Sequence, residues 1–468
     1  MTALHDLVDW VPLGAPAYLF LITVVVFFHE LGHFSVARYF GTRVETFSIG
    51  FGPAIVSWTD RHNTKWKISW IPFGGYVKFF GDADAASTTD RDAVEKMSDA
   101  DRKVAFPFKP LYQRAAIVAA GPFANFILAI VIFTLTIFFF GRAIEPPVIG
   151  LVYPHSAAEA AGIKSGDIVR SINGQAIHDF DDLPAVISLS AGQDLAIELE
   201  RDGRLLTVHA TPRLMTVTDP LGDKVKSIAL GIGHDVPAVV SKVLPGSVAD
   251  KAGLETGDVI TAIDNQPILG FGEFAAFVDG HKDKSFALSL RRSGQPLTVH
   301  LTASTATKGI DNPHDERANV LGAVSPPYPK VTIVHYGPVQ AFGAALGQTW
   351  LIIKGTLITI WQIVAGYSDT SQLHGPVGVA GVAKKIASLG FLALLQLAAL
   401  MSVSIGLINL FPIPLLDGGH LLYYGFEAVL GRPLGERAQD LGFRLGLAVV
   451  LGLMIFVTWN DLARLNLF

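Results

Sequence analysis

Four apolar runs along the chain are long enough to cross a membrane as helices, or can be extended by their flanks to do so. These runs are residues 16–40, 115–140, 389–411 and 445–458. A fifth run, residues 350–365, is short and contains Lys354, which favours a helix lying at the membrane interface. The hydrophobic pattern therefore predicts a polytopic α-helical membrane protein with four spans.

The segment between the first two runs changes to a period of two, with polar residues alternating with aromatic and aliphatic ones over residues 65–70. This alternation predicts a membrane-associated β-hairpin or small sheet. The following stretch, residues 74–79, allows two interpretations: an edge that pairs with an extended substrate backbone, or a part of an interfacial sheet anchored by tryptophans. The substrate-binding residues of the first interpretation are Gly74, Gly75, Tyr76 and Val77. Residues 82–109 are polar and are expected to form a cytoplasmic loop.

An internal repeat occupies the middle of the chain. Residues 154–177 align without gaps to residues 245–268, and ten positions are identical. Each copy has a short helix ending at a glycine, a Gly-Asp pair and a β-rich run, and resembles a PDZ domain over residues 145–213 and 228–304. Neither copy has a clear Gly-Leu-Gly-Phe loop for a peptide carboxylate. Peptide capture therefore competes with a steric screening role, which we favour slightly.

Composition narrows the class of protein. Half of the 468 residues are hydrophobic and 16% are charged, which fits a membrane protein with soluble parts. A formal net charge of −5 without a Lys/Arg-rich run gives no sign of nucleic-acid binding. The absence of cysteine excludes disulfides and thiolate metal sites. No Lys or Arg precedes Arg38, so the first run lacks the basic start of a removable signal peptide and should be retained.

The pentapeptide His29-Glu30-Leu31-Gly32-His33 lies inside the first apolar run. On a helix the two histidines share one face and can hold Zn²⁺, while Glu30 can take a proton from water. The alternatives are a chance match or packing histidines. Ionisable groups within a membrane span are costly and by default functional, so metal-dependent hydrolysis is favoured.

Lys and Arg residues orient the first span, because none precedes it and six follow within residues 38–78. Cytoplasmic segments are enriched in these residues, so the C-terminal end of the span should face the cytoplasm. His29 lies about 20 Å along the helix from residue 16, towards the cytoplasmic side. The second span returns outward, which places the repeat outside the cytoplasm.

Two histidines do not complete a catalytic zinc site, which takes three protein ligands and keeps one position open. Glu45 follows closely but lies in the strand-like segment. The third long run ends near Asp417. If the repeat lies outside the cytoplasm, this run crosses towards the cytoplasm and brings Asp417 to the cytoplasmic side of the membrane, where His29 and His33 are also expected. Asp417 is therefore the expected third ligand. Gly418 and Gly419 would permit the tight turn that places Asp417, or they simply belong to a loop that begins with glycines.

Three motifs and the PDZ-like pair together resemble the site-2 protease family of intramembrane zinc metalloproteases, above all its bacterial tandem-PDZ members, over essentially the whole chain. The motifs are HELGH, Gly121-Pro122-Phe123-Ala124-Asn125, and Asn409 eight residues before Leu416-Asp417-Gly418. The resemblance implies His29, His33 and Asp417 as Zn²⁺ ligands and Glu30 as the general base. It also implies that Asn409 positions substrate or stabilises an oxyanion. Asn125 is either a substrate contact or an interhelical hydrogen bond. His420 is expected to support the ligands from behind or to be structural, rather than to be a ligand itself.

The resemblance further implies cleavage of single-span membrane proteins, such as an anti-sigma factor after an earlier extracytoplasmic cut, and of remnant signal peptides. The protein would lie in a bacterial inner membrane, with its PDZ domains periplasmic and its active site towards the cytoplasm. The expected organisation is residues 1–144 with two spans, 145–213 and 228–304 as PDZ domains, 305–387 as a connector and 388–468 with two spans.

Two other classes of protein remain open from the sequence. A catalytically inactive scaffold would bind partners through the PDZ pair, but all four site residues of a protease are intact. A transporter would show inverted repeats among the spans, and the repeat here lies in the soluble part.

Overall fold

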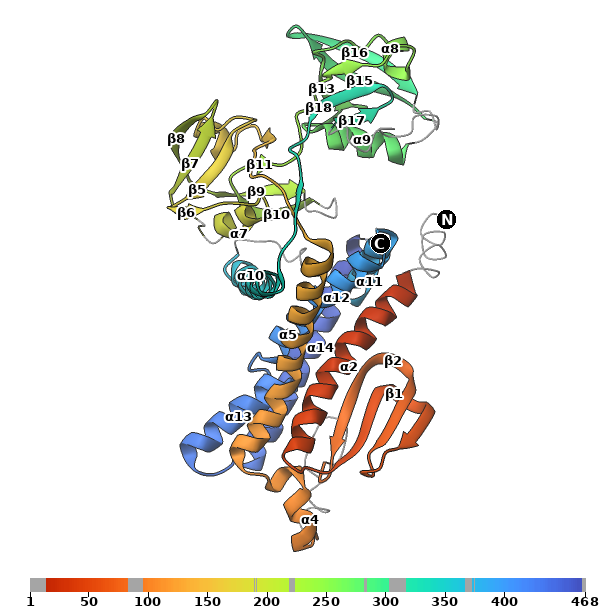
Figure 1. Ribbon diagram of the computed structural model, residues 1–468, viewed down its shortest axis with the longest axis vertical. Coiled ribbons are helices and arrows are strands. Elements are labelled where there is room, and N and C mark those ends of the chain that lie inside the picture. Colours follow the sequence, from red (N-terminus) through yellow and green to blue (C-terminus); the bar gives the residue numbers. More distant parts are fainter. Residues whose placement is uncertain are drawn as a thin grey trace. The chain divides into compact units, whose positions relative to one another are not determined.

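The computed structural model describes residues 14–464, except 83–95, 189, 191, 219–223, 282–283, 303–316, 367–372 and 374. The chain forms two compact units. The helical unit lies within residues 1–141, 335–360 and 370–468, and the β-rich unit within residues 142–334 and 361–369. Figure 1 shows the elements of both.

The helical unit contains all four expected apolar helices. They are α2 (Gly14–Tyr39), α5 (Leu111–Phe140), α12 (Phe391–Asn409) and α14 (Glu436–Arg464). The helix around Lys354 is α10 (Pro338–Val364), which begins twelve residues earlier than the apolar run indicates. Five helices among the described residues, α10 included, are long and apolar enough to cross a membrane, so length alone does not decide between four spans and five.

Shorter elements connect these helices. Of the expected loop at residues 82–109, residues 83–95 lie outside the described part of the chain, and the rest forms α4 (Asp99–Val104) and the 3₁₀ turn η1 (Phe106–Phe108). Helix α11 (Pro376–Ser388) precedes α12, and α13 (Asp417–Leu430) follows it. The N-terminal end of α11 is capped by Asp461, whose carboxylate accepts hydrogen bonds from the backbone N–H groups of Gly375 and Gly378 at 3.0 and 2.8 Å.

Helix α2 buries a single stripe of side chains. Its buried residues recur every four positions, so they fall on one face of the helix. They are Ala17, Leu21, Val25, His29, His33 and Ala37, after Gly14. A Cβ on Gly32 would lie 2.3 Å from the carbonyl oxygen of Ala120 on α5, so glycine is required for α2 and α5 to approach this closely. The two histidines are therefore held inside the helix bundle.

The expected small sheet is confirmed as β1 (Val44–Thr59) paired antiparallel with β2 (Lys65–Phe79). Each strand pairs twice, because residues 44–49 bond to residues 75–79 on one side and to residues 65–68 on the other. Positive φ angles at Gly50, Gly52 and Gly74 accompany these changes of partner. The result is four paired segments, with residues 75–79 at one edge.

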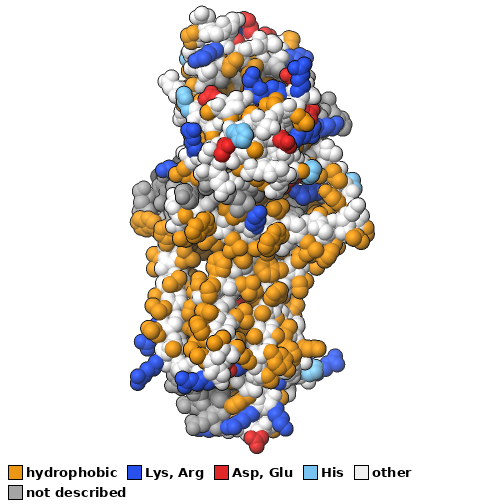
Figure 2. All heavy atoms as spheres, turned by 90° about the vertical axis from the view of Figure 1, so that its left-hand side faces the viewer, with side chains coloured by type: hydrophobic (Ala, Val, Ile, Leu, Met, Phe, Trp, Pro, Cys, Tyr) orange, Lys and Arg blue, Asp and Glu red, His pale blue; other side chains and the backbone are white. Residues whose placement is uncertain are grey.

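The outer side of this sheet carries exposed apolar side chains. They include Ile55, Val56, Trp58, Trp70 and Ile71, each about half or more exposed. Figure 2 shows a broad band of hydrophobic side chains over the helices, and Lys and Arg gather at the end where α4 lies. An exposed apolar surface of this extent, bounded by cations, is the surface of a protein embedded in lipid.

The β-rich unit contains the sequence repeat as two copies with matching sheets. The first has strand order β6-β5-β7-β8 and the second β14-β13-β15-β16. Their strands are β5 (Ile168–Ile172), β6 (Gln175–Ala176), β7 (Leu195–Arg201), β8 (Arg204–Ala210), β13 (Val259–Ile263), β14 (Gln266–Pro267), β15 (Ser285–Arg292) and β16 (Gln295–Thr302). A short helix, α7 (Asp182–Ser188) or α9 (Phe271–Gly280), completes each copy.

Each copy has its own hydrophobic core, and each core extends past the boundary expected from the sequence. The first core takes in Leu230, and the second takes in Val320 and Leu321. A matching ion pair closes each copy: the Arg201 guanidinium bonds both oxygens of buried Asp167, and Arg292 does the same to buried Asp258. The sequence repeat is thus a structural repeat.

Candidate metal centre

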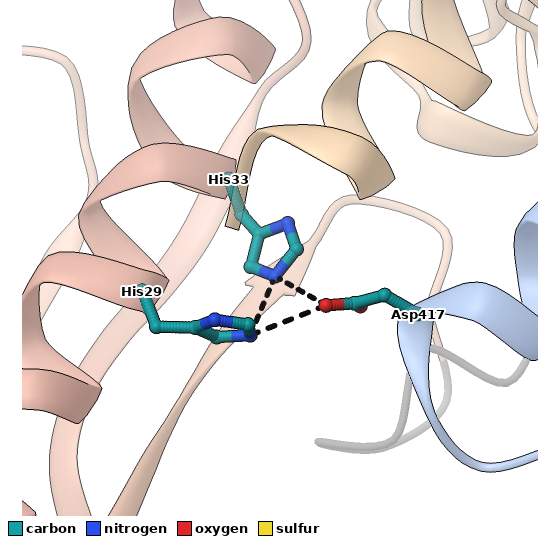
Figure 3. A group of neighbouring side chains, drawn as sticks. All are labelled: His29, His33 and Asp417. Carbon is teal, nitrogen blue, oxygen red and sulfur yellow. Dashed lines mark hydrogen bonds and ion pairs between the residues drawn. The ribbon is translucent and has the colours of Figure 1, made fainter. Parts of the chain in front are cut away.

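His29 and His33 present their Nε2 atoms to each other from one face of α2, at a distance of 3.2 Å. Both side chains are about nine-tenths buried. Figure 3 shows both rings turned towards the carboxylate of Asp417, which comes from α13. The motif and the distant aspartate therefore meet at one point, as the sequence predicts.

Asp417 is the first residue of α13, and the backbone before it is sharply bent. Leu415 has φ of 109°, a region that L side chains rarely occupy, and such strain is concentrated at functional sites. Gly418 and Gly419 have no positive φ, so they do not serve a turn. A Cβ on Gly418 would lie 2.3 Å from the carbonyl oxygens of Leu410 and Phe411, which shows that these glycines let α13 pack against the preceding loop.

The donor atoms fit a bound zinc ion. Asp417 Oδ2 lies 3.2 Å from His29 Nε2 and 3.5 Å from His33 Nε2, and it is buried without a hydrogen-bond partner among the described residues. Two ligands about 2.1 Å from a tetrahedral zinc ion lie about 3.4 Å apart, so all three spacings are those of neighbouring ligand atoms. Among the described residues, these three side chains form the one group of His and carboxylate ligands close enough to hold a metal ion.

The second nitrogen of each histidine has a defined partner. His33 Nδ1 lies 2.9 Å from the carbonyl oxygen of Ile117, which can only accept, so Nδ1 carries a proton and, in the neutral imidazole, the lone pair is on Nε2. His29 Nδ1 lies 3.2 Å from the side-chain amide nitrogen of Asn125. Both partners belong to α5, so α5 orients the imidazoles of α2.

Gly121 leaves the space that His33 occupies. A Cβ at this position would lie 2.2 Å from His33 Nε2, far inside any real contact. The glycine of the Gly-Pro-Phe-Ala-Asn segment is therefore required for the His33 ring to occupy its observed position. Sequence inspection identified the motif, but the reason for its glycine is visible only in the structure.

A cavity of about 190 Å³ opens beside the three donor atoms. Glu30, Asn409, Gly75, Tyr76 and Val77 all line it, so five of the residues singled out from the sequence lie together beside the donor atoms. Gly74 does not line it and instead supplies the bend before this stretch, with φ of 110°. The volume is enough for several water molecules or a short piece of extended peptide.

The sheet edge lies directly against Glu30. A Cβ on Gly75 would lie 3.4 Å from Glu30 Cγ, and the backbone N–H of Val77 is within hydrogen-bonding reach of the Glu30 carboxylate. The other side of this strand segment pairs with residues 47–49 of β1, so one backbone edge of residues 75–77 faces the cavity. An extended peptide can add to such an edge.

His420, which the sequence predicts to be a structural neighbour rather than a ligand, and Tyr424, to which the sequence gives no role, also face the candidate metal centre. His420 and Tyr424 follow Asp417 on α13 at helical spacing and line the same cavity. The spacing of three and four residues was the available signal, because it puts all three side chains on one helix face. Arg114 on α5 fixes this helix through a bidentate ion pair with Glu427, at 3.2 and 2.6 Å.

Comparison with known proteins agrees with this geometry. The model of Peptidase family M50 matches residues 17–453. A protein named as a zinc metalloprotease in Rhizobium meliloti (strain 1021) is 36% identical over 456 residues, covering 97% of this chain and 98% of the relative. One so named in Mesorhizobium japonicum is 37% identical over 446 residues, covering 95% and 97%. The Regulator of sigma-E protease of Salmonella typhimurium (strain 14028s / SGSC 2262) is 36% identical over 460 residues, covering 96% and 98%.

Proposed function

Because the chain belongs to peptidase family M50, the site-2 proteases, and is a zinc-dependent protease of the membrane, we propose that it cleaves peptide bonds within the transmembrane segments of single-span proteins. One observation carries the proposal: two histidines and an aspartate with ligand spacing lie beside a glutamate and a free strand edge, within helices of membrane-spanning length.

The residues around the cavity divide the chemistry of hydrolysis. Zinc held by His29, His33 and Asp417 would polarise the scissile carbonyl and lower the pKa of water. Glu30 takes the proton of the attacking water and delivers it to the leaving amine. Asn409, at the last position of α12, has a side-chain amide that can donate to the developing oxyanion or position the substrate.

The strand edge at Gly75, Tyr76 and Val77 holds the substrate in extended form. A helical transmembrane segment hides its carbonyls in i→i−4 hydrogen bonds, so it must unwind before attack. Pairing of the unwound stretch with this edge replaces the lost hydrogen bonds and sets the scissile bond beside Glu30.

The helix lengths and the charge distribution support the proposed topology. His29 lies about 22 Å along α2 from Gly14, and His33 lies about 9 Å before Tyr39, which supports a site at membrane depth, nearer the C-terminal end of α2. Lys and Arg gather at that end of the helical unit, which supports a cytoplasmic location. In Figure 1, α10 is seen along its axis, whereas α2 and α5 are seen from the side. This difference in direction supports an interfacial α10 and four spans.

The β-rich unit serves as a pair of PDZ domains on the extracytoplasmic side of the inner membrane. Its repeated sheets and separate cores support two domains of one kind. They screen which proteins reach the membrane site, or bind a peptide tail. Anti-sigma-factor substrates and remnant signal peptides are the proposed targets, in line with the name of the Salmonella relative.

The test is cleavage of a single-span membrane protein by purified enzyme in proteoliposomes. We expect Glu30→Gln to lower the rate about 10²- to 10⁴-fold while zinc content and melting temperature stay unchanged. Glu45→Gln is the matched control, because Glu45 pairs with Lys78 outside the cavity, and its rate should stay within twofold. Undiminished cleavage by the Glu30 variant would refute the mechanism. Wild-type protein that binds partners but cleaves none would favour the scaffold.

A further inference from the structure

Asn125 is a fully buried polar residue on α5, at the place where this helix meets α2 and α12. Its backbone carbonyl accepts a hydrogen bond from Ser402 Oγ at 2.9 Å. Its side-chain amide faces His29 Nδ1 at 3.2 Å, and its Oδ1 has no hydrogen-bond partner among the described residues. A carboxamide in an apolar helix interface is costly unless its groups are used, so this contact needs a reason.

The contact decides which nitrogen of His29 carries the proton. A neutral imidazole has one N–H and one lone pair. With the amide nitrogen of Asn125 donating to Nδ1, the proton of His29 must sit on Nε2, the atom that faces Asp417 and His33. A metal ligand needs a lone pair there instead.

Rotation of the Asn125 carboxamide by 180° reverses this assignment. Oxygen and nitrogen exchange places with almost no change of shape, so Oδ1 comes to lie beside His29 Nδ1. Oδ1 then accepts from Nδ1–H, and the Nε2 lone pair faces Asp417. His33 already has this arrangement, fixed by the carbonyl of Ile117.

We propose that Asn125 is a positioning residue of the metal centre, whose carboxamide oxygen accepts the Nδ1 proton of His29 and so fixes the imidazole as a ligand through Nε2. The inference rests on the proposed zinc site. His33 is oriented by the backbone carbonyl of Ile117, which a side-chain substitution does not remove. His29 is oriented by the side chain of Asn125, which a substitution at position 125 does remove.

The position of Asn125 excludes the substrate-contact role left open from the sequence. Asn125 is not among the residues that line the cavity, and its side chain is completely inaccessible. It contacts His29 at Nδ1, whereas the donor atom for a metal ion is the other ring nitrogen, Nε2. The structure instead has an interhelical hydrogen bond between Asn125 on α5 and His29 on α2, and His29 is a candidate metal ligand.

The experiment measures the zinc dissociation constant of the full-length purified protein by chelator competition. Asn125→Asp keeps the shape and always offers an accepting oxygen, so its constant should stay within about threefold of wild type. Asn125→Leu and Asn125→Ala offer no acceptor and should weaken zinc binding about 10- to 100-fold. Ser402→Ala is the matched control, because it removes a neighbouring buried hydroxyl without touching the carboxamide, and its constant should not change.

Two results would overturn the inference. The first is zinc binding within threefold of wild type in Asn125→Leu or Asn125→Ala, whichever of the two stays monodisperse. The second is an Asn125→Asp variant whose zinc binding is weakened 10-fold or more. His29→Ala separates this inference from the proposed function. If His29→Ala holds as much zinc as wild type, the proposed metal site itself is wrong. If His29→Ala loses zinc but the Asn125 variants keep it, only the positioning role of Asn125 is refuted.

Discussion

Gly121→Ala places a single methyl group against His33, a proposed ligand of the metal ion. The new Cβ would lie 2.2 Å from His33 Nε2, 2.5 Å from Cε1 and 2.8 Å from Cδ2. Real Cβ atoms essentially never approach other heavy atoms within 3.0 Å, so the imidazole must retreat by about 0.8 Å or more. Because zinc–nitrogen distances vary by only about 0.2 Å, His33 cannot keep its place as a ligand beside an unmoved α5.

The imidazole has little freedom to retreat. His33 Nδ1 is tied to the carbonyl of Ile117 at 2.9 Å, and the ring is about nine-tenths buried between α2 and α5. We therefore expect Gly121→Ala to weaken zinc binding at least 100-fold and to abolish cleavage, since losing one of three ligands leaves an incomplete site. Zinc affinity by chelator competition and cleavage of a membrane substrate are the two assays.

The matched control is Gly425→Ala on α13, the helix that carries Asp417. No atom lies within 4 Å of a Cβ at this position, and alanine favours a helix over glycine by about 1 kcal/mol. Its zinc affinity and activity should equal those of wild type. Gly121→Ala protein that binds zinc within threefold of wild type and cleaves normally would refute the crowding argument.

Three further outcomes are expected. Asp417→Asn replaces an anionic ligand by a neutral amide, so zinc affinity should fall at least 100-fold by chelator competition, and unchanged affinity would remove Asp417 from the site. Burial alone would raise the pKa of Asp258, but its ion pair with Arg292 holds the pKa below the ordinary value. The stabilisation it gives is therefore complete above about pH 4 and lost at lower pH, and Asp258→Asn should lower the melting temperature at pH 7 much more than at pH 3. Asp461→Ala removes the cap of α11 and should cost about 1–2 kcal/mol in thermal unfolding without changing zinc content, whereas an unchanged melting temperature would contradict the capping role.

The sequence predicts the parts of this protein that follow a regular pattern. The apolar runs locate α2, α5 and α12 because lipid demands continuous apolar helices, and the spacing of His29 and His33 puts both on one face. Helix α14 extends the apolar run of residues 445–458 at both ends, as expected if its flanks continue the helix, and its first turns contain charged residues that are compatible with a helix but not with a hydrophobic run. Helix α13 was not predicted, because its polar, glycine-containing first turn resembles a loop.

The placement of Asp417 needed more than the pattern. The choice of this residue depended on a topology argument and a family resemblance, and the structure brings it within 3.5 Å of both histidines. The means of placing it were not predictable, because the strained φ of Leu415 and the close approach of Gly418 to residues 410–411 depend on contacts between separate elements. The same holds for Gly121 and Asn125, whose roles exist only once α5 lies against α2.

A diffraction experiment at the zinc absorption edge, on crystals of the full-length protein, tests the proposed zinc site. We expect one anomalous peak within about 2.0–2.2 Å of His29 Nε2, His33 Nε2 and Asp417 Oδ2, on the cavity side of α2 beside Glu30. A zinc peak bound by other residues in an enzyme that cleaves membrane substrates, or an active enzyme without zinc at these three residues, would contradict it.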